Sequence, residues 1–264
     1  MKIAKNICEL GGTMAPRDSI VSFLDSFLKA KEIRDHSQNG LQTEGSAEVA
    51  RIALGVSASL EFLKNAALLK AEMALVHHGL LWGRSQVYRG PYKSKIKLLM
   101  DSDMSLLAYH LPLDLHPAVG NNAQILGCLG AKSLQPFAEY DGQTIGFRGS
   151  LPCTVSLRKV SSILRKKLGS SCISFPFGPS KIRTIGVVSG GAADLLPQAV
   201  DAGLDLYITG DVKESTQEAC REAGINFISA GHYNSEKAGV KALAPLLERK
   251  FKVRTFFIDI PNPV

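Results

Sequence analysis

Residues 51–79 read RIALGVSASLEFLKNAALLKAEMALVHHG, and this stretch has the pattern of a strand, a helix and a second strand. Residues 51–57 and 73–78 are apolar runs of strand length, and 58–71 carries apolar residues at helical spacing. A strand, a helix and a strand in this order form the unit from which parallel sheets are built. The second strand ends in His77 and His78, which places two polar side chains at the carboxyl edge of the predicted sheet.

The same alternation continues along the chain. Further strands are predicted at 105–110, 182–189, 204–210, 225–232 and 253–260, with helices at 17–31, 94–103, 192–203 and 215–224. This pattern predicts an α/β protein. Residues 186–210, GVVSGGAADLLPQAVDAGLDLYITG, match residues 55–79 in element order, which suggests an internal duplication.

The predicted elements fall into two α/β domains. We assign residues 18–125 together with 232–264 to the first domain, 126–231 to the second, and 1–17 to an N-terminal extension. Residues 126–181 are richer in Gly, Pro and Ser, with short strand-like pieces such as TIGFRGSL and one basic helix at 155–168. Because no low-complexity linker separates the halves, we expect them to pack closely.

Composition is that of a soluble globular chain. The 264 residues are 45% hydrophobic and 21% charged, and no apolar run reaches the ~18–20 residues needed to span a bilayer. Five cysteines without a CxxC pair indicate reduced thiols, so we expect a cytoplasmic protein without membrane contact. The net charge of +7 favours anionic partners such as nucleotides or nucleic acid. The cluster of basic residues in 155–168 is more typical of a solvated helix face.

Metal-ligand residues follow three of the predicted strands: His77, His78, Asp114, His232 and Glu236. His232 and Glu236 lie four apart at a predicted helix start, so their side chains point the same way. Carboxyl ends of strands gather at one sheet edge, and imidazole and carboxylate both bind divalent transition metals. A shared metal site is therefore predicted, and two ions sharing one carboxylate would explain the number of ligands and would suit hydrolysis. Ordinary hydrogen bonding is the alternative for each residue alone, and Asp114 could instead fix a turn.

Six motifs in order resemble one known family. They are NGLQTEG (39–45), VHHGLLW (76–82), YHLPLDLHPAVGNNAQ (109–124), LYITGDVKE (206–214), AGHYNSEKAG (230–239) and FIDIPNP (257–263). Together they resemble the GTP cyclohydrolase I type 2 homologues, the Ngg-interacting-factor-three-like proteins, in their short bacterial form. The resemblance covers the chain from about residue 18 to its end.

The resemblance implies a dinuclear metal site held by His77, His78, Asp114, His232 and Glu236, with Glu236 as the bridge. It also implies two intertwined α/β domains with that site between them, assembled as a homohexameric ring. The metal is left open among zinc, iron, manganese and nickel. The chain departs from the family pattern in its extension of about 17 residues, in Tyr233 and in Asp211, where Glu is common. Tyr233 and Asp211 put the carry-over of substrate specificity in doubt.

Other polar residues are assigned secondary roles. His110 is the candidate catalytic residue, as a proton carrier or as a group that orients a ligand, with a backbone hydrogen bond as the alternative. Thr209 and Asp211 are candidates for substrate contact. Asn39, Gln42, Arg84 and Arg89 have the same potential, against turn-forming or solvated roles.

Two functions of different classes follow. The first is a metal-dependent hydrolase acting on a nucleotide, by GTP ring opening or by hydrolysis of a damaged nucleotide. The second is a non-catalytic metal-binding ring that binds DNA or protein partners. The chain lacks the Gly-x4-Gly-Lys-Ser/Thr phosphate loop and the G-x-S-x-G elbow, which argues against a P-loop GTPase and a serine hydrolase.

Overall fold

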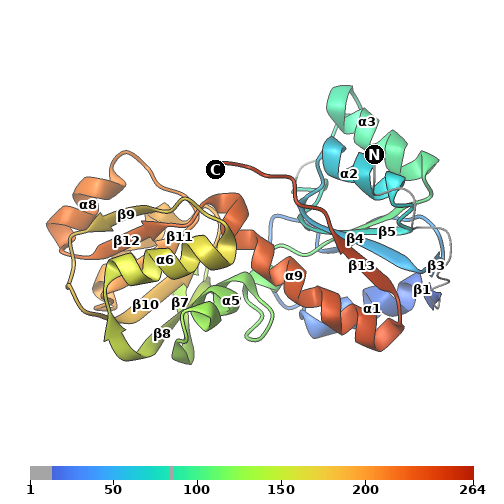
Figure 1. The fold of residues 1–264 in the computed structure, drawn as a ribbon. Coiled ribbons are helices and arrows are strands. Elements are labelled where there is room, and N and C mark those ends of the chain that lie inside the picture. The colour runs from blue at the N-terminus through green and yellow to red at the C-terminus, as the bar shows by residue number, and fades with distance from the viewer. Residues whose placement is uncertain (1–13, 84–85) are drawn as a thin grey trace.

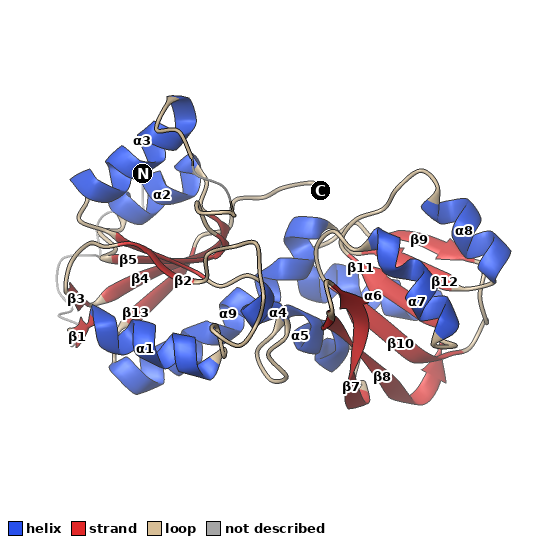
Figure 2. Ribbon diagram, turned by 180° about the vertical axis from the view of Figure 1, so that it is seen from behind, coloured by secondary structure: helices blue, strands red, loops and turns tan. Residues whose placement is uncertain are grey.

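The computed structural model describes residues 14–83 and 86–264. Its strands form two larger sheets, one in each of two lobes joined by a long helix (Figure 1). Helices cover the sheets (Figure 2), and the predicted α/β class is confirmed. Among residues 14–83 and 86–264, no helix is both long and apolar enough to cross a membrane.

The first sheet has five strands in the order β13-β4-β5-β6-β2. Their bounds are β2 Gly40–Thr43, β4 Arg51–Ser57, β5 Met73–His78, β6 Ser105–Ala108 and β13 Arg254–Phe257. Strands β13, β4, β5 and β6 are parallel, and β2 runs antiparallel to β6. One face packs against α1 (Arg17–Phe27), and the other against α2 (Leu60–Leu68) and α3 (Gly90–Asp101). Burial on both faces explains why β4 and β5 are continuous apolar runs.

The second sheet has six strands in the order β7-β8-β10-β11-β12-β9. Their bounds are β7 Lys132–Tyr140, β8 Gln143–Val155, β9 Ile173–Pro176, β10 Ile182–Val188, β11 Leu206–Thr209 and β12 Asn226–Ser229. The helices in this part of the chain are α6 Leu157–Leu168, the 3₁₀ turn η1 Ala193–Leu195, α7 Leu196–Asp201 and α8 Thr216–Ala223. Strands β10, β11 and β12 are parallel, and β9 runs antiparallel to β12. The order β10-β11-β12-β9 thus repeats the order β4-β5-β6-β2, so the two sheets share one plan.

The hairpin of β7 and β8 is longer than the short strand-like pieces predicted in this region. Most of β7 is exposed, and it contains Pro136 and a register shift between Lys132 and Gln135. These features remove the apolar alternation by which a strand is recognised in a sequence. The hairpin adds two antiparallel strands to the edge of the second sheet at β10.

Helix α9 (His232–Phe251) runs from the second lobe into the first (Figure 1). It begins three residues after β12, and its later residues Val240, Leu243 and Leu247 are buried in the core of the first lobe. The short helix α4 (Leu111–Asp114) and helix α5 (Asn121–Cys128) pack beside it. The first turn of α9 therefore lies at the junction of the lobes.

The N-terminal end of the described chain is tied to the first lobe, and the C-terminal end lies at the junction of the lobes. Residues 1–13 of the segment interpreted as an extension lie outside the described residues, whereas Ala15 and Pro16 form β1 and pair with β3 (Glu48–Val49). At the other end, the segment after β13 returns to the start of α9. There the backbone N–H of Tyr233 donates to the carbonyl of Val264 at 3.0 Å.

Candidate metal centre

The five residues predicted as metal ligands converge at the junction of the lobes. His77 and His78 end β5, Asp114 ends α4, and His232 and Glu236 form the first turn of α9. His77 Nε2 lies 3.5 Å from Asp114 Oδ2 and 3.5 Å from Glu236 Oε1. Glu236 Oε2 lies 3.3 Å from His78 Nε2, and Glu236 Oε1 lies 3.3 Å from His232 Nε2. One buried carboxylate thus contacts all three imidazoles.

The buried ends of these side chains have unmet bonding capacity. Within the described residues, Glu236 Oε2 and His77 Nε2 are buried and have no hydrogen-bond partner, although each faces the other groups of the cluster. Burying unpaired polar atoms is unfavourable, so this arrangement calls for a cation among them. Two ligand atoms bound tetrahedrally to one zinc ion, each at roughly 2.1 Å, lie about 3.4 Å apart. The observed separations of 3.3–3.5 Å fit that requirement.

The electrostatics also favour a cation. Burial opposes the charge of Glu236, but His77 and His78 hold the pKa of this carboxyl well below its usual range. Burial would lower the pKa of His77, yet Asp114 and Glu236 raise it to about 9. The hydrogen bond to Glu236 raises the pKa of His232 to about 9 as well. The negative charge of the carboxylates holds protons on the imidazoles of His77 and His232. The same negative charge would attract a divalent metal ion.

The outer nitrogen of each histidine is held by a neighbour. His77 Nδ1 lies 2.9 Å from the carbonyl oxygen of Tyr109, and because a carbonyl only accepts, this nitrogen carries the proton. When the ring is neutral, Nε2 is then the atom whose lone pair can bind a metal ion. His232 Nδ1 pairs with Asp211 Oδ1 at 3.1 Å, and His78 Nδ1 with the Ser57 hydroxyl at 3.1 Å. Such outer contacts fix the tautomer and the orientation of metal-binding imidazoles.

Asp114 is oriented by groups from both halves of the molecule. Its Oδ1 accepts hydrogen bonds from Asn121 Nδ2 at 2.8 Å and from the Ser189 hydroxyl at 2.9 Å, which leaves Oδ2 toward His77. Asn121 in turn accepts the backbone N–H of Gly239 in α9 at 2.7 Å. The spacing of α4, α5, α9 and the end of β10 therefore sets the position of this carboxylate.

His110, the predicted catalytic residue, is held by a carboxylate that sequence reasoning missed. Its Nδ1 donates to Asp35 Oδ1 at 2.9 Å, and its backbone N–H donates to Asn39 Oδ1 at 2.7 Å. The side chain of Asp35 is only 2% exposed and also accepts the backbone N–H groups of Ser37 and Leu111. Burial opposes its charge, but the hydrogen bond from His110 lowers the pKa of Asp35 to about 2.

The ring of His110 lies beside the cluster. Its centroid is 5.0 Å from that of His77 and 5.6 Å from that of His78. Ring nitrogens of these three histidines all lie within 4.8 Å of one another, as do ligand atoms of His78, His232 and Glu236. These histidine and glutamate groups have the composition and spacing to hold a divalent metal ion.

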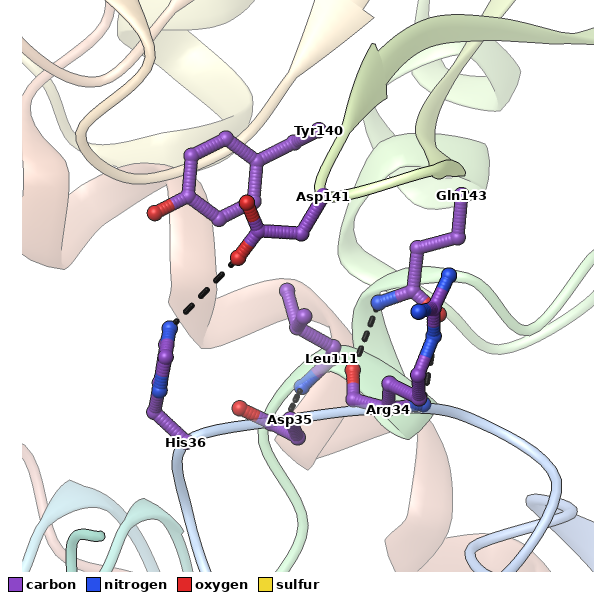
Figure 3. A pocket seen from close by; sticks show the side chains of 7 residues that line it. All are labelled: Arg34, Asp35, His36, Leu111, Tyr140, Asp141 and Gln143. Carbon is purple, nitrogen blue, oxygen red and sulfur yellow. Dashed lines mark hydrogen bonds and ion pairs between the residues drawn. The ribbon is translucent and has the colours of Figure 1, made fainter.

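The loop that carries Asp35 is clamped by the other lobe (Figure 3). The carbonyl of Arg34 accepts a hydrogen bond from Gln143 Nε2, and His36 Nε2 lies 3.6 Å from Asp141 Oδ2. A cavity of about 430 Å³ lies here, lined by these residues with Leu111 and Tyr140. The turn between β7 and β8 therefore supports the loop that positions His110.

The predicted substrate-contact residues occupy different environments. Thr209 is fully buried, and its hydroxyl donates to the carbonyl of Gly190 and accepts the N–H of Ala192. Asp211 is part-exposed, holds His232, and lines a second cavity of about 380 Å³ at the ends of β10, β11 and β12.

Two polar residues of the segment 35–45, Asn39 and Gln42, hold the backbone around the cluster. Asn39 holds the backbone of His110, and Gln42 Oε1 accepts the N–H groups of Leu80 and Leu81. Arg89 is exposed at the start of α3, and Arg84 lies outside the described residues.

The fold and the site define an α/β protein with a histidine–carboxylate centre between two lobes. The chain belongs to the Duf34/NIF3 (NGG1p interacting factor 3) family, whose model matches residues 15–263. This confirms the family resemblance predicted from the six motifs.

Known relatives share most of the chain. It is 42% identical over 243 residues to the "GTP cyclohydrolase 1 type 2 homolog" of Archaeoglobus fulgidus, covering 92% of this chain and 97% of the relative. The Pseudomonas aeruginosa protein of the same name is 41% identical over 246 residues, covering 93% and 97%. A solved structure from Thermus thermophilus superposes with a TM-score of 0.87 at 35% identity, covering 95% of this chain and all of that one. The structure of ybgI, described as of unknown function, gives 0.89 at 34% identity with the same coverage.

Proposed function

We propose that this chain is a dinuclear metal-dependent hydrolase that acts on a nucleotide. The observation that carries the proposal is the position of Glu236. Its buried carboxylate contacts His77, His78 and His232, and His77 also faces Asp114, so we infer that Glu236 is shared by one ligand trio with His77 and Asp114 and another with His78 and His232. Two metal ions, which we expect to be zinc, iron, manganese or nickel, would each take one trio.

Ions held there would lower the pKa of a bound water molecule and polarise the bond to be cleaved. The protein's own contribution is orientation. Outer contacts from Tyr109, Ser57 and Asp211 fix the imidazoles of His77, His78 and His232. Asp35 holds His110 Nδ1, so that Nε2 of His110 is the ring atom free to bond a water molecule or substrate beside the cluster.

Two features support a nucleotide as the substrate. The relatives from Archaeoglobus fulgidus and Pseudomonas aeruginosa are named as homologues of a GTP cyclohydrolase. The net charge of +7 favours an anionic ligand. Ring opening of GTP and hydrolysis of a damaged nucleotide are the two reactions we propose, with Asp211 as a substrate-contact residue and a cytoplasmic homohexameric ring as the assembly.

The test is turnover of a nucleotide panel that includes GTP. The full chain is reconstituted with zinc, manganese or iron, and Glu236→Ala serves as the control. Product that requires both the metal and Glu236 supports the hydrolase. Stoichiometric metal binding without product from any nucleotide refutes it; salt-sensitive DNA affinity in that case would favour the non-catalytic ring that binds DNA.

A further inference from the structure

Trp82 is an aromatic residue placed among the histidines instead of in a core. It lies four residues after His78, in the loop that follows β5, and is half-buried. Its ring centroid is 5.0 Å from that of His110, edge to face, and 6.0 Å from that of His78. Trp82 packs into none of the four hydrophobic cores formed by the described residues. A partly exposed indole beside a polar cluster contributes little to core stability, so its position calls for another explanation.

The indole is held in place by the surrounding loops. Its Nε1 donates to the carbonyl of Gly79 at 3.0 Å, which uses the only polar atom of the ring. The backbone of Trp82 forms an antiparallel bridge with Ser37, and the carbonyl of the preceding Leu81 accepts the N–H of Gln38 at 3.0 Å. What remains free to contact a ligand is therefore apolar ring surface whose orientation is fixed before any ligand binds.

We propose that Trp82 is the platform on which a planar heteroaromatic ring of the substrate stacks beside the metal centre. The inference rests on the proposed nucleotide substrate and adds which group recognises the base. An indole accepts any base on its π-face, and such stacking contributes without base-specific hydrogen bonds. A ring stacked there lies next to His78 and His110, and thus next to the groups that would act on it.

Trp82 also provides its own reporter, because it is the single tryptophan of the chain. The zinc-reconstituted full chain is titrated with GTP while its tryptophan emission is followed, with free N-acetyltryptophanamide correcting for light absorbed by GTP. Inorganic tripolyphosphate, which has the charge but no base, is titrated in parallel. We expect saturable quenching by GTP and none by tripolyphosphate.

Affinity is measured separately by equilibrium dialysis of GTP. Stacking contributions of the usual size predict that Trp82→Leu weakens GTP binding by roughly 5- to 150-fold. Trp82→Phe, which keeps a π-face, should retain most of the affinity. Binding of tripolyphosphate and the zinc content should be unchanged in both variants. Tyr88→Leu removes an exposed aromatic outside the cluster and is the matched control.

The outcomes distinguish failure of the stacking proposal from failure of the hydrolase proposal. GTP that binds without quenching, and equally well to Trp82→Leu, overturns the stacking and leaves the nucleotide assignment intact. Quenching and weakened binding without turnover uphold the stacking and refute the hydrolase. If dialysis retains none of GTP, ATP and guanosine, the nucleobase platform and the nucleotide substrate are both wrong.

Discussion

The Asp35→Asn substitution should damage the centre although Asp35 touches none of the proposed metal ligands through its own hydrogen bonds. Oδ1 of Asp35 accepts the N–H of Ser37 and of His110, and Oδ2 accepts the N–H of Leu111 and the Asn39 amide. An asparagine turns one of these oxygens into an NH2 group. If Oδ2 is replaced, the bonds from Leu111 and Asn39 are lost; if Oδ1 is replaced, Ser37 loses its bond and His110 keeps only its longer contact with Oδ2, at 3.2 Å.

The size of the expected destabilisation follows from the number of hydrogen bonds lost. Hydrogen bonds to a charged group contribute about 1.5–3 kcal/mol each, so losing one to two of them predicts a fall of about 1.5–6 kcal/mol in the free energy of unfolding. One relief is open if the amide replaces Oδ1, because His110 can then move its proton to Nε2 and accept at Nδ1. That relief places an N–H, instead of a lone pair, toward His77 and His78. The substitution should therefore lower either the free energy of unfolding or the affinity of the centre for metal.

The assay combines urea unfolding with zinc affinity measured by competition with a chelator. Asp35→Asn should lower the urea midpoint, or weaken zinc binding at least tenfold, or do both. The matched control is Asp25→Asn, because Asp25 accepts one hydrogen bond, from the Tyr109 hydroxyl at 2.6 Å, and an amide oxygen can still accept it. An Asp35→Asn protein that matches the wild type in both measurements would refute the positioning role of Asp35.

Two further changes test other parts of the structure. Tyr233→Phe removes the hydroxyl that donates to Asp259 and accepts the N–H of Ile260. It should lower the free energy of unfolding by about 1–2 kcal/mol and speed amide hydrogen exchange in residues 258–264, without changing the metal content. Unchanged exchange in these residues would contradict the contact. Burial would raise the pKa of Glu72, but hydrogen bonds from Arg51 lower it. The ionised Glu72 carboxylate therefore stabilises the folded protein above the unfolded pKa of about 4.5, and this stabilisation is lost as the pH falls through the lower folded pKa. Glu72→Gln should therefore be less stable than the wild type near neutral pH, with a gap in urea midpoint that narrows as the pH falls below about 4.5. A gap independent of pH would count against this pair.

Much of this architecture is local in sequence and therefore predictable from it. The apolar runs of β4, β5, β10 and β11 are buried on both faces of their sheets, and that burial is what their composition records. The predicted ligands follow strand ends, where the fold gathers polar groups. His232 and Glu236 are neighbours on one helical turn, and their spacing indicated a joint role once it was combined with the other histidines and carboxylates at strand ends.

The supporting contacts could not be predicted because they join distant parts of the chain. Asp35 and His110 are 75 positions apart, as are Asp114 and Ser189. No periodicity links such residues, and a polar loop such as 35–45 has the composition of an ordinary turn. Only the packing of the two lobes around α9 shows that the polar residues of this loop support the centre.

The central claim is a centre for two metal ions built around Glu236, and metal stoichiometry tests it most directly. The full chain is dialysed to equilibrium against zinc or manganese, and its metal content is measured by mass spectrometry beside Glu236→Ala and Glu61→Ala, an exposed glutamate in α2. We predict about two ions per chain in the wild type and in Glu61→Ala, and no more than one in Glu236→Ala. A wild type that retains one ion or fewer, or a Glu236→Ala protein that retains as many ions as the wild type, would contradict the account.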